Sequence, residues 1–237
     1  MKEERVFYNP FRMLSPRLEE EASRIEQLHE EPVQDSLSLE QGLLMMISKA
    51  IEITRLLSKS VLLTSPETLQ KCEALAKDVH EQEKILTRNL VTSDIRGEVM
   101  KGLIRFPYRL ERIGDLLESI LNCFRVRTRD NVQFGDKAAA ELDQMFDVLL
   151  EMMVNLRDAF QLPNKIILNQ VVADGNKLSE MTEEFKLAHW ERLEGGFVAV
   201  EASSLYRDIL DSVKDISEYL VKMAKTLLEL GDRSQAR

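Results

Sequence analysis

Apolar residues recur along most of this chain at intervals of three and four positions, which is the spacing of an amphipathic helix. The clearest stripe falls between residues 36 and 63. Its members are Leu39, Leu43, Met46, Ala50, Ile53 and Leu57. No segment combines strict apolar–polar alternation with turn signals, so strands are not predicted. The pattern therefore predicts an all-α protein.

Polar and glycine-containing breaks divide this pattern into six long helices. Ser65 precedes Pro66 and Glu67, which places an N-cap, a proline at the first helical position and an acid in the first turn. The clearest loop spans residues 128–136. The predicted helices cover about 36–63, 66–91, 94–127, 137–161, 163–193 and 197–230, and the last begins after Gly195-Gly196. Before them we predict an extended arm at residues 1–15 and a short helix at about 17–31.

The two halves of the helical region contain a related segment. Residues 110–120 (LERIGDLLESI) and 210–220 (LDSVKDISEYL) agree in residue type at seven of eleven positions, and each lies in the third helix of its half. This agreement favours an internal duplication. The predicted organisation is two tandem three-helix bundles, at residues 36–130 and 131–237, after an N-terminal arm and short helix at residues 1–35.

Composition excludes several classes of protein. The 237 residues include 41 acids and 32 bases, and the net charge of −9 argues against a nucleic-acid partner. No apolar run approaches the roughly 18 residues of a membrane-spanning helix. The N-terminal sequence has no apolar stretch typical of a secretory signal. Cys72 and Cys123 fit reduced thiols, so we expect a cytoplasmic protein.

Each predicted bundle carries a row of carboxylates on the side of its third helix that faces away from the apolar stripe. The first row consists of Glu111, Asp115 and Glu118. The second row consists of Asp211, Asp215 and Glu218. Residues at i, i+4 and i+7 share one helix face, and carboxylate oxygens are the ligands of hard metal ions. The six acids are therefore candidate metal ligands, with a solvated acidic face as the alternative.

Glu83 is a seventh candidate ligand, because it falls on the apolar stripe of the second predicted helix, where a carboxylate must be paired, reach water or meet an ion. The histidines are interpreted as surface or partly buried residues without a ligand. Only Glu26 and His29 have the Glu-x-x-His spacing of di-iron bundles, so a ferritin-like oxidase is not expected. No nucleophile motif or glycine-rich phosphate loop is present, and neither catalytic nor nucleotide-binding residues are predicted.

The segment RLERIGD at residues 109–115, with its echo RDILDSVKD at 207–215, resembles the PhoU family. It is most similar to the branch of accessory proteins encoded beside low-affinity (Pit-type) phosphate transporters. The resemblance covers about residues 36–230. It implies two tandem three-helix bundles and a cytoplasmic regulator of phosphate uptake. It also implies iron or another divalent or trivalent metal ion on the acids that match the motif, which are Glu111, Asp115, Asp211 and Asp215.

The chain departs from this branch in the second helix of each bundle. Glu83 matches a family acid, but Thr87 stands where the next acid is expected, and Thr182 and Lys186 replace both acids in the second bundle. We therefore expect metal binding to be stronger in the first bundle.

The resemblance favours a non-enzymatic protein that binds a membrane phosphate transporter or its signalling proteins at the inner membrane face. A homo-oligomer is compatible with this role. The alternatives are a metal-dependent enzyme that uses the same carboxylates and a metal-free helical adaptor.

Overall fold

The computed structural model describes residues 39–92 and 102–235, and within them it contains six helices and no strand. The predicted N-terminal arm, the short helix, and Glu26 with His29 lie outside these ranges. The helices are α2 (Leu39–Leu62), α3 (Pro66–Thr92), α5 (Phe106–Arg129), α6 (Asp136–Gln161), α7 (Lys165–Glu194) and α8 (Val200–Gln235). The all-α prediction is confirmed.

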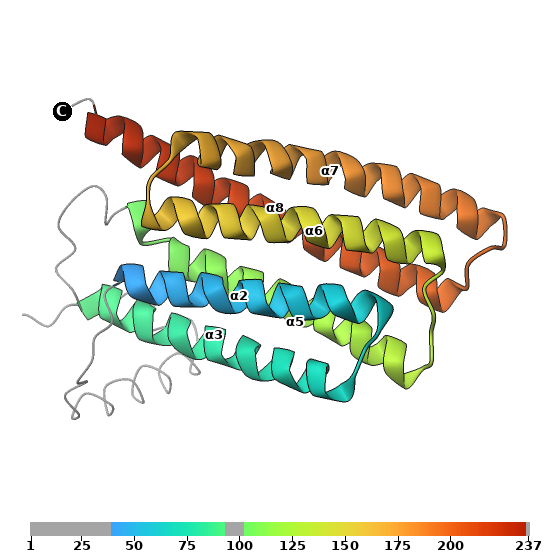
Figure 1. Cartoon of the computed structure of the whole chain (residues 1–237). Coiled ribbons are helices and arrows are strands. Elements are labelled where there is room, and N and C mark those ends of the chain that lie inside the picture. The colour runs from blue at the N-terminus through green and yellow to red at the C-terminus, as the bar shows by residue number, and fades with distance from the viewer. Residues whose placement is uncertain (1–38, 93–101, 236–237) are drawn as a thin grey trace, which may run out of the picture. The chain divides into compact units, whose positions relative to one another are not determined.

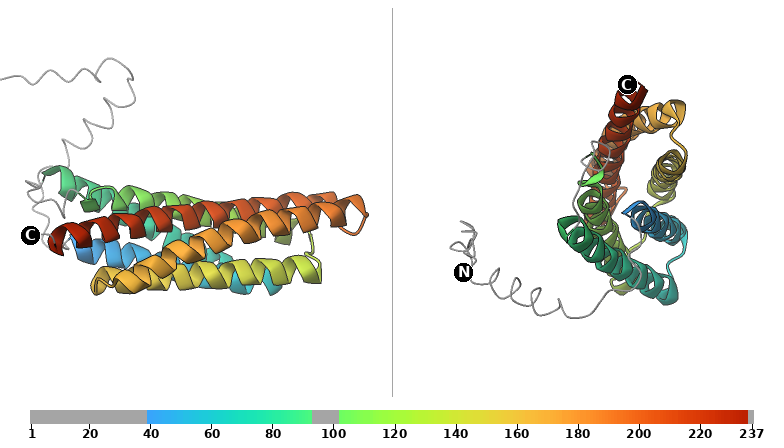
Figure 2. Two further views of the ribbon diagram at one scale, coloured as in Figure 1. Left: turned by 90° about the horizontal axis from the view of Figure 1, so that it is seen from above. Right: turned by 90° about the vertical axis from the view of Figure 1, so that its left-hand side faces the viewer.

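The six helices form two sets of three within one compact unit, residues 37–237. In the first set α2, α3 and α5 pack against one another, and in the second α6, α7 and α8 do so. The sets meet where α2 packs on α6 and α5 packs on α8. Figure 1 shows the helices lying along nearly the same direction, and the two views of Figure 2 agree. The tandem three-helix arrangement is confirmed, whereas the division into separate domains at residue 130 stays a prediction.

The starts of two helices follow from local chemistry. The Ser65 hydroxyl accepts a hydrogen bond from the Thr68 amide at 3.1 Å, as expected of an N-cap. Asn164 does the same for α7, because its side-chain oxygen accepts from the amides of Ile166 at 2.9 Å and Ile167 at 3.4 Å. Residues 130–135 connect the two sets of helices, close to the predicted loop.

The prediction of one continuous helix from about residue 94 is wrong at its start, because α5 begins at Phe106 after a turn at residues 104–105. Pro107 lies in the first turn of α5. Proline lacks the amide hydrogen that an inner helical position must donate, but the first turn leaves that hydrogen without a partner in any case. The apolar periodicity that continues upstream of Pro107 concealed this boundary.

The apolar stripes of all six helices meet in a single core. On α5 the buried stripe consists of Phe106, Leu110, Ile113, Leu117, Ile120, Leu121 and Phe124. On α8 the corresponding stripe includes Ile209, Val213, Ile216 and Leu220, each at most 1% exposed. The carboxylate rows lie off these two stripes, as the sequence predicts, so the stripes fix which faces of α5 and α8 remain for other roles.

Side-chain contacts also cross between the two sets. The Arg109 guanidinium of α5 donates to the Lys222 carbonyl and to the Thr226 hydroxyl of α8, both at 3.0 Å. The rings of Phe106 and Phe160 lie 5.9 Å apart between their centroids, which joins α5 to α6. These contacts add directional interactions to the apolar burial that holds the sets together.

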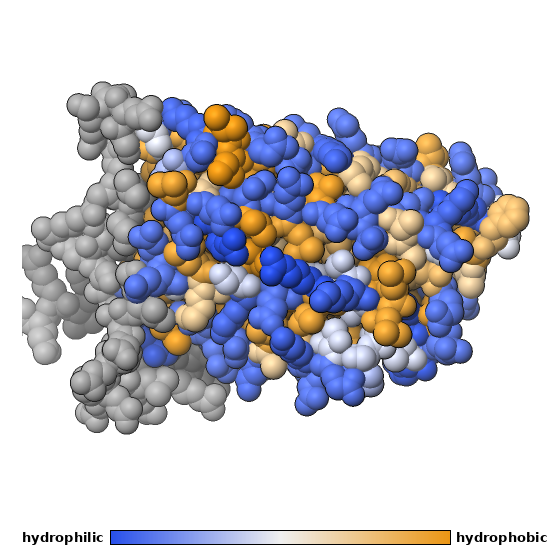
Figure 3. Space-filling model, in the orientation of Figure 1, coloured by the Kyte–Doolittle hydropathy of each residue, from blue (hydrophilic) through white to orange (hydrophobic). Residues whose placement is uncertain are grey.

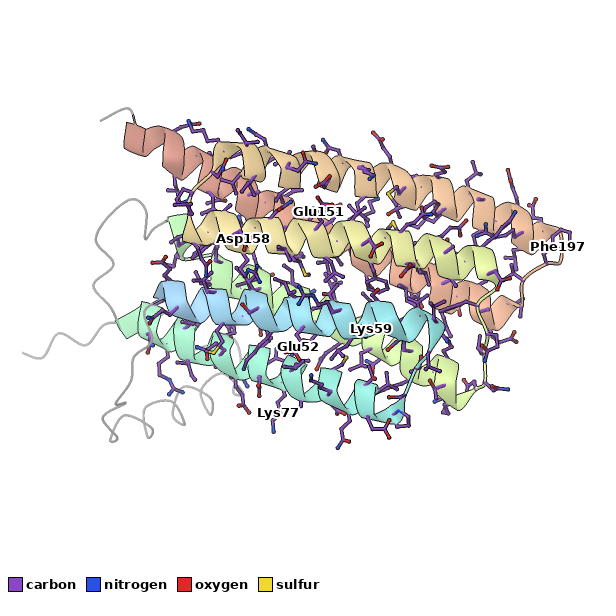
Figure 4. The ribbon with its side chains drawn as sticks, viewed as in Figure 1. Glu52, Lys59, Lys77, Glu151, Asp158 and Phe197 are labelled. Atoms are coloured by element: carbon purple, nitrogen blue, oxygen red, sulfur yellow. The ribbon has the colours of Figure 1, made fainter. Side chains whose placement is uncertain are left out.

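The face drawn in Figure 3 is largely hydrophilic, with apolar atoms showing between polar side chains. In Figure 4, Glu52 and Lys59 of α2 and Glu151 and Asp158 of α6 lie on this face. Among the described residues, no helix is long and apolar enough to cross a membrane.

Leu110→Ala or Ile113→Ala should each lower the free energy of unfolding by about 2–4 kcal/mol, because each truncation leaves a cavity in the core. Leu187→Ala is the matched control, since Leu187 is 64% exposed and the same truncation there should cost far less. Chemical denaturation of the three variants measures this. Equal losses would show that the buried face of α5 is misassigned.

Candidate functional site

The first carboxylate row lies along the side of α5 that faces α3. The side chains of Glu111, Asp115 and Glu118 are 32%, 35% and 42% exposed, so they are half-buried and not fully solvated. Glu83 of α3 is also half-buried and lies close enough to raise the pKa of Glu111 by repulsion. We call these four residues the first acidic cluster. The structure thus brings together the four candidate ligands predicted for this bundle.

His80 of α3 lies against this cluster. Its Nδ1 atom is 4.0 Å from Glu111 Oε1, and its Nε2 atom is 3.7 Å from both Asp115 Oδ1 and Glu118 Oε2. Its side chain is 25% exposed. An imidazole at this position adds a nitrogen donor to a set of carboxylate oxygens. The prediction that His80 is a surface or partly buried residue is confirmed, and whether it binds a ligand is not tested by its position.

A close approach of the two helices at Gly114 positions His80 beside the row. A Cβ atom at residue 114 would lie 3.3 Å from Val79 Cγ1, which is tighter than ordinary van der Waals contact. Val79 immediately precedes His80, so the absence of a side chain at Gly114 lets this turn of α3 pack close to α5. The glycine of the RLERIGD segment thus has a packing function.

Negative charge is only partly relieved within the first acidic cluster. Burial raises the pKa of Glu111 above its ordinary value of 4.5, and repulsion from Glu83 and Asp115 raises it further, whereas His80 and Arg112 oppose the shift. The Arg112 guanidinium pairs with Asp115 at 2.5 Å. Glu83 accepts a hydrogen bond from the Thr87 hydroxyl, also at 2.5 Å.

The second row has a different electrostatic environment. We call Asp211, Asp215 and Glu218 of α8 the second acidic cluster. Lys186 of α7 forms an ion pair with Asp211, and Lys222 lies 3.5 Å from Glu218. Burial raises the pKa of Asp215 above 3.8, as does repulsion from the other two acids, but Lys214 and Lys186 oppose the shift. Lysine ammonium groups therefore offset part of the negative charge of the second cluster, whereas no lysine ion pair is formed by the acids of the first cluster among the described residues.

The two clusters differ in how well they fit a metal ion. Across residues 39–92 and 102–235, no group of three or more His, Cys, Asp or Glu side chains is close enough to hold one. The first cluster nevertheless has carboxylate and imidazole donors on facing helices, which suit several divalent and trivalent ions. In the second cluster an ammonium group lies against Asp211, and that does not fit a cation.

Sequence reasoning missed His80 and misjudged His189. His80 has no spacing motif on α3, and only the antiparallel register of α3 against α5 brings it to the acids. His189 is 1% exposed, so the interpretation as a surface or partly buried residue is wrong. Its ring stacks on Tyr206 with the centroids 4.3 Å apart, and its Nε2 atom lies 2.8 Å from the Ser203 hydroxyl.

Comparisons with known proteins add a structural relative. No protein-family model matches the sequence, and no curated protein matches it. The fold is similar to that of PhoU. The crystal structure of the phosphate transport system regulatory protein PhoU from Streptococcus pneumoniae superposes with a TM-score of 0.71 at 14% sequence identity. The match covers 81% of this chain and 93% of that PhoU chain.

Glu111→Gln should raise the free energy of unfolding at pH 7 by a few tenths of a kcal/mol, about the cost of a like-charge pair one helical turn apart. The raised pKa means that ionised Glu111 destabilises the folded state, and this penalty exists only above its ordinary pKa of 4.5. The advantage of the variant should therefore shrink as pH falls and vanish near pH 4. Urea denaturation at both pH values measures it.

Asp211→Asn is the matched control for this variant, because it removes an ion pair with Lys186 in place of a repulsion. It should destabilise by roughly 0.2–1 kcal/mol at pH 7. If both variants changed the free energy of unfolding in the same direction, the proposed electrostatic difference between the clusters would be wrong.

Proposed function

We propose that this protein is a cytoplasmic, non-enzymatic regulator of phosphate uptake that acts by binding a membrane phosphate transporter or one of its signalling proteins. The observation that carries the proposal is the PhoU-like fold, which matches 93% of a protein described as a phosphate transport system regulator. The RLERIGD segment supports a finer assignment to the accessory proteins of Pit-type transporters. A phosphate-transporter gene beside this one would support that assignment further.

The first acidic cluster is the surface we assign to the partner. Its four carboxylates lie on adjoining sides of α3 and α5, with Arg112 and His80 as the basic groups beside them. Burial and then repulsion from Glu83 and Asp115 raise the pKa of Glu111, and a basic cytoplasmic segment of a transporter would relieve the repulsion. Charge complementarity of this kind fixes the orientation of a complex and speeds association. The second cluster, already paired with lysines, has less to gain.

The exposure of these carboxylates favours binding over catalysis. A general acid or base works in a site that excludes water and holds the substrate at hydrogen-bond distance. Glu111, Asp115 and Glu118 are each about a third or more exposed. They form an open face that a protein segment can cover. A metal-dependent enzyme built on these acids is the less favoured alternative.

Phosphate uptake in the source organism tests the proposed function. A strain that lacks this gene should show altered uptake of radiolabelled phosphate, and the wild-type gene should restore it. The triple variant Glu111→Gln, Asp115→Asn, Glu118→Gln should fail to restore uptake, because it removes the charge that we assign to the partner. Immunoblots establish that the variant accumulates.

The matched control is Asp211→Asn, Asp215→Asn, Glu218→Gln, which makes the same change of charge at the equivalent positions of the second bundle. This variant should restore uptake. Restoration by both triple variants would show that the partner surface lies elsewhere. A deletion strain with unchanged uptake would reject the function itself.

We also propose that the first acidic cluster, with His80, is the cation-responsive part of the protein. Mn²⁺, Zn²⁺, Mg²⁺ or Fe³⁺ that binds only the folded state should raise the unfolding temperature. The rise should fade as pH falls to about 4–5, where carboxylates of this kind become protonated. Glu111→Gln with Asp115→Asn should abolish the rise, whereas Asp211→Asn with Asp215→Asn should leave most of it. The absence of any rise in the wild type would favour the metal-free adaptor.

A further inference from the structure

A cavity of about 210 Å³ lies at the end of the second set of helices where α6 begins and α7 ends. It is half open to solvent, and its walls come from the start of α6, the end of α7, the α7–α8 loop and the start of α8. Its apolar walls include Phe134, Phe197, Val198 and Ala202, and its polar residues include His189, Arg192 and Tyr206. Figure 4 labels Phe197 in the loop that joins α7 to α8.

Glu141 of α6 anchors a hydrogen-bonded network beside the cavity. The two terminal nitrogens of the Arg192 guanidinium donate to the two carboxylate oxygens of Glu141 at 2.8 and 2.6 Å. The Tyr206 hydroxyl donates to the same carboxylate at 2.5 Å. Glu141 and Arg192 are only 15% and 17% exposed, so this is a largely buried ion pair. Three donors satisfy the Glu141 carboxylate.

His189 has its proton on the nitrogen that lacks a partner. Its Nε2 atom is 2.8 Å from the Ser203 hydroxyl. Within the described part of the chain, that hydroxyl has no other acceptor for its hydrogen, so it donates to Nε2. A neutral imidazole that accepts at Nε2 carries its proton on Nδ1. Burial lowers the pKa of His189, which favours the neutral ring.

Two buried donors of the cavity lining therefore lack an acceptor. They are His189 Nδ1 and Arg192 Nε, and neither has a hydrogen-bond partner among the described residues. Buried polar groups in folded proteins are almost always satisfied, by protein, water or ligand. Two unmatched N–H donors on neighbouring turns of α7 call for a ligand with acceptor oxygens.

The electrostatic field at this point favours a negative ligand. Burial is the largest cause of the lowered pKa of His189. The guanidiniums of Arg192 and Arg207 lower this pKa further, whereas the Glu141 carboxylate opposes the shift. The start of α6 also lines the cavity, and its N-cap, Gly135, has no side chain with which to satisfy the free amides of the first turn. The exposed Asp136 carboxylate is the opposing charge at this helix end.

We propose that this cavity binds a small organic carboxylate with an apolar body about the size of a phenyl ring. The carboxylate would accept from His189 Nδ1 and Arg192 Nε, and the ring would lie against Phe134, Val198 and Ala202. An apolar cavity of about 150 Å³ already holds benzene, so the size is sufficient. Inorganic phosphate has no apolar part to contact these walls and would lose its hydration among them.

Entry to the site depends on the loop at residues 195–199. Both unmatched nitrogens are closed off from solvent, so neighbouring side chains or this loop must shift before a ligand reaches them. Phe197 is 83% exposed, and its ring lies 2.5 Å from where a Cβ atom of Gly195 would stand. Gly196 has a φ of +72°, which few other residues adopt. A wider hollow of about 540 Å³ shares Lys137, Arg192 and Phe197 with the cavity.

Isothermal titration calorimetry on the full chain tests the proposal, with benzoate as the probe. Benzoate should bind with a dissociation constant of about 1 mM or lower. Benzyl alcohol keeps the ring but lacks the charge, and acetate keeps the charge but lacks the ring. Each should bind at least about tenfold more weakly than benzoate. Inorganic phosphate should also bind more weakly than benzoate.

The double variant His189→Leu with Ser203→Ala removes one donor while leaving no orphaned partner, a change that buried sites tolerate well. It should weaken benzoate binding at least about tenfold. Ala202→Leu fills the cavity and changes no residue of the polar network. It should abolish benzoate binding, and it serves as the test if the double variant does not fold. Leu187→Ala, at an exposed position of α7, is the control that should bind normally. Nitrogen NMR of the His189 ring should show Nδ1 protonated and its signal shifted by benzoate.

Three results would overturn the proposal: no benzoate binding at about 10 mM, equal binding of benzoate and benzyl alcohol, or tighter binding of phosphate. Unchanged benzoate binding by Ala202→Leu would also overturn it. These results would leave the proposed partner surface on α3 and α5 unaffected, because that surface is tested by phosphate uptake.

Discussion

Burial of the apolar stripes of α5 and α8 is the constraint on which the rest of the structure depends. Leu110, Ile113 and Leu117 must face the core, and the 3.6-residue period of the helix then leaves one place for the acids of the first cluster, on the side toward α3. The same argument places the second cluster beside α7. The carboxylates are therefore positioned by the packing of the residues between them, and a change in that packing would move the charges as well.

The two sets of helices share a core but differ in charge. In the first half, α3 presents His80 and Glu83 to the row on α5, and repulsion remains. In the second half, α7 presents Lys186 to Asp211, and the row is largely compensated. This difference supports assigning the partner and the cation to the first half.

The sequence predicted the features that depend on residues near one another in the chain. These are the apolar stripes, the Ser65 cap, the loop near residue 130 and the repeat. It did not predict the contacts of His80 or the burial of His189, because both depend on how one helix registers against another. The start of α5 at Phe106 was also missed, since apolar spacing continued through a turn. Whether metal or a transporter binds is a property of the surface that periodicity does not encode.

Gly114 links the packing of the first half to its charge. Its equivalent in the repeat, 100 positions on, is Lys214. That lysine extends toward α7 and pairs with Glu183 at 3.2 Å, whereas at Gly114 a single hydrogen atom lets α3 close in with His80. The residue at this one position of the repeat thus sets both the spacing of a helix pair and one charge at its surface.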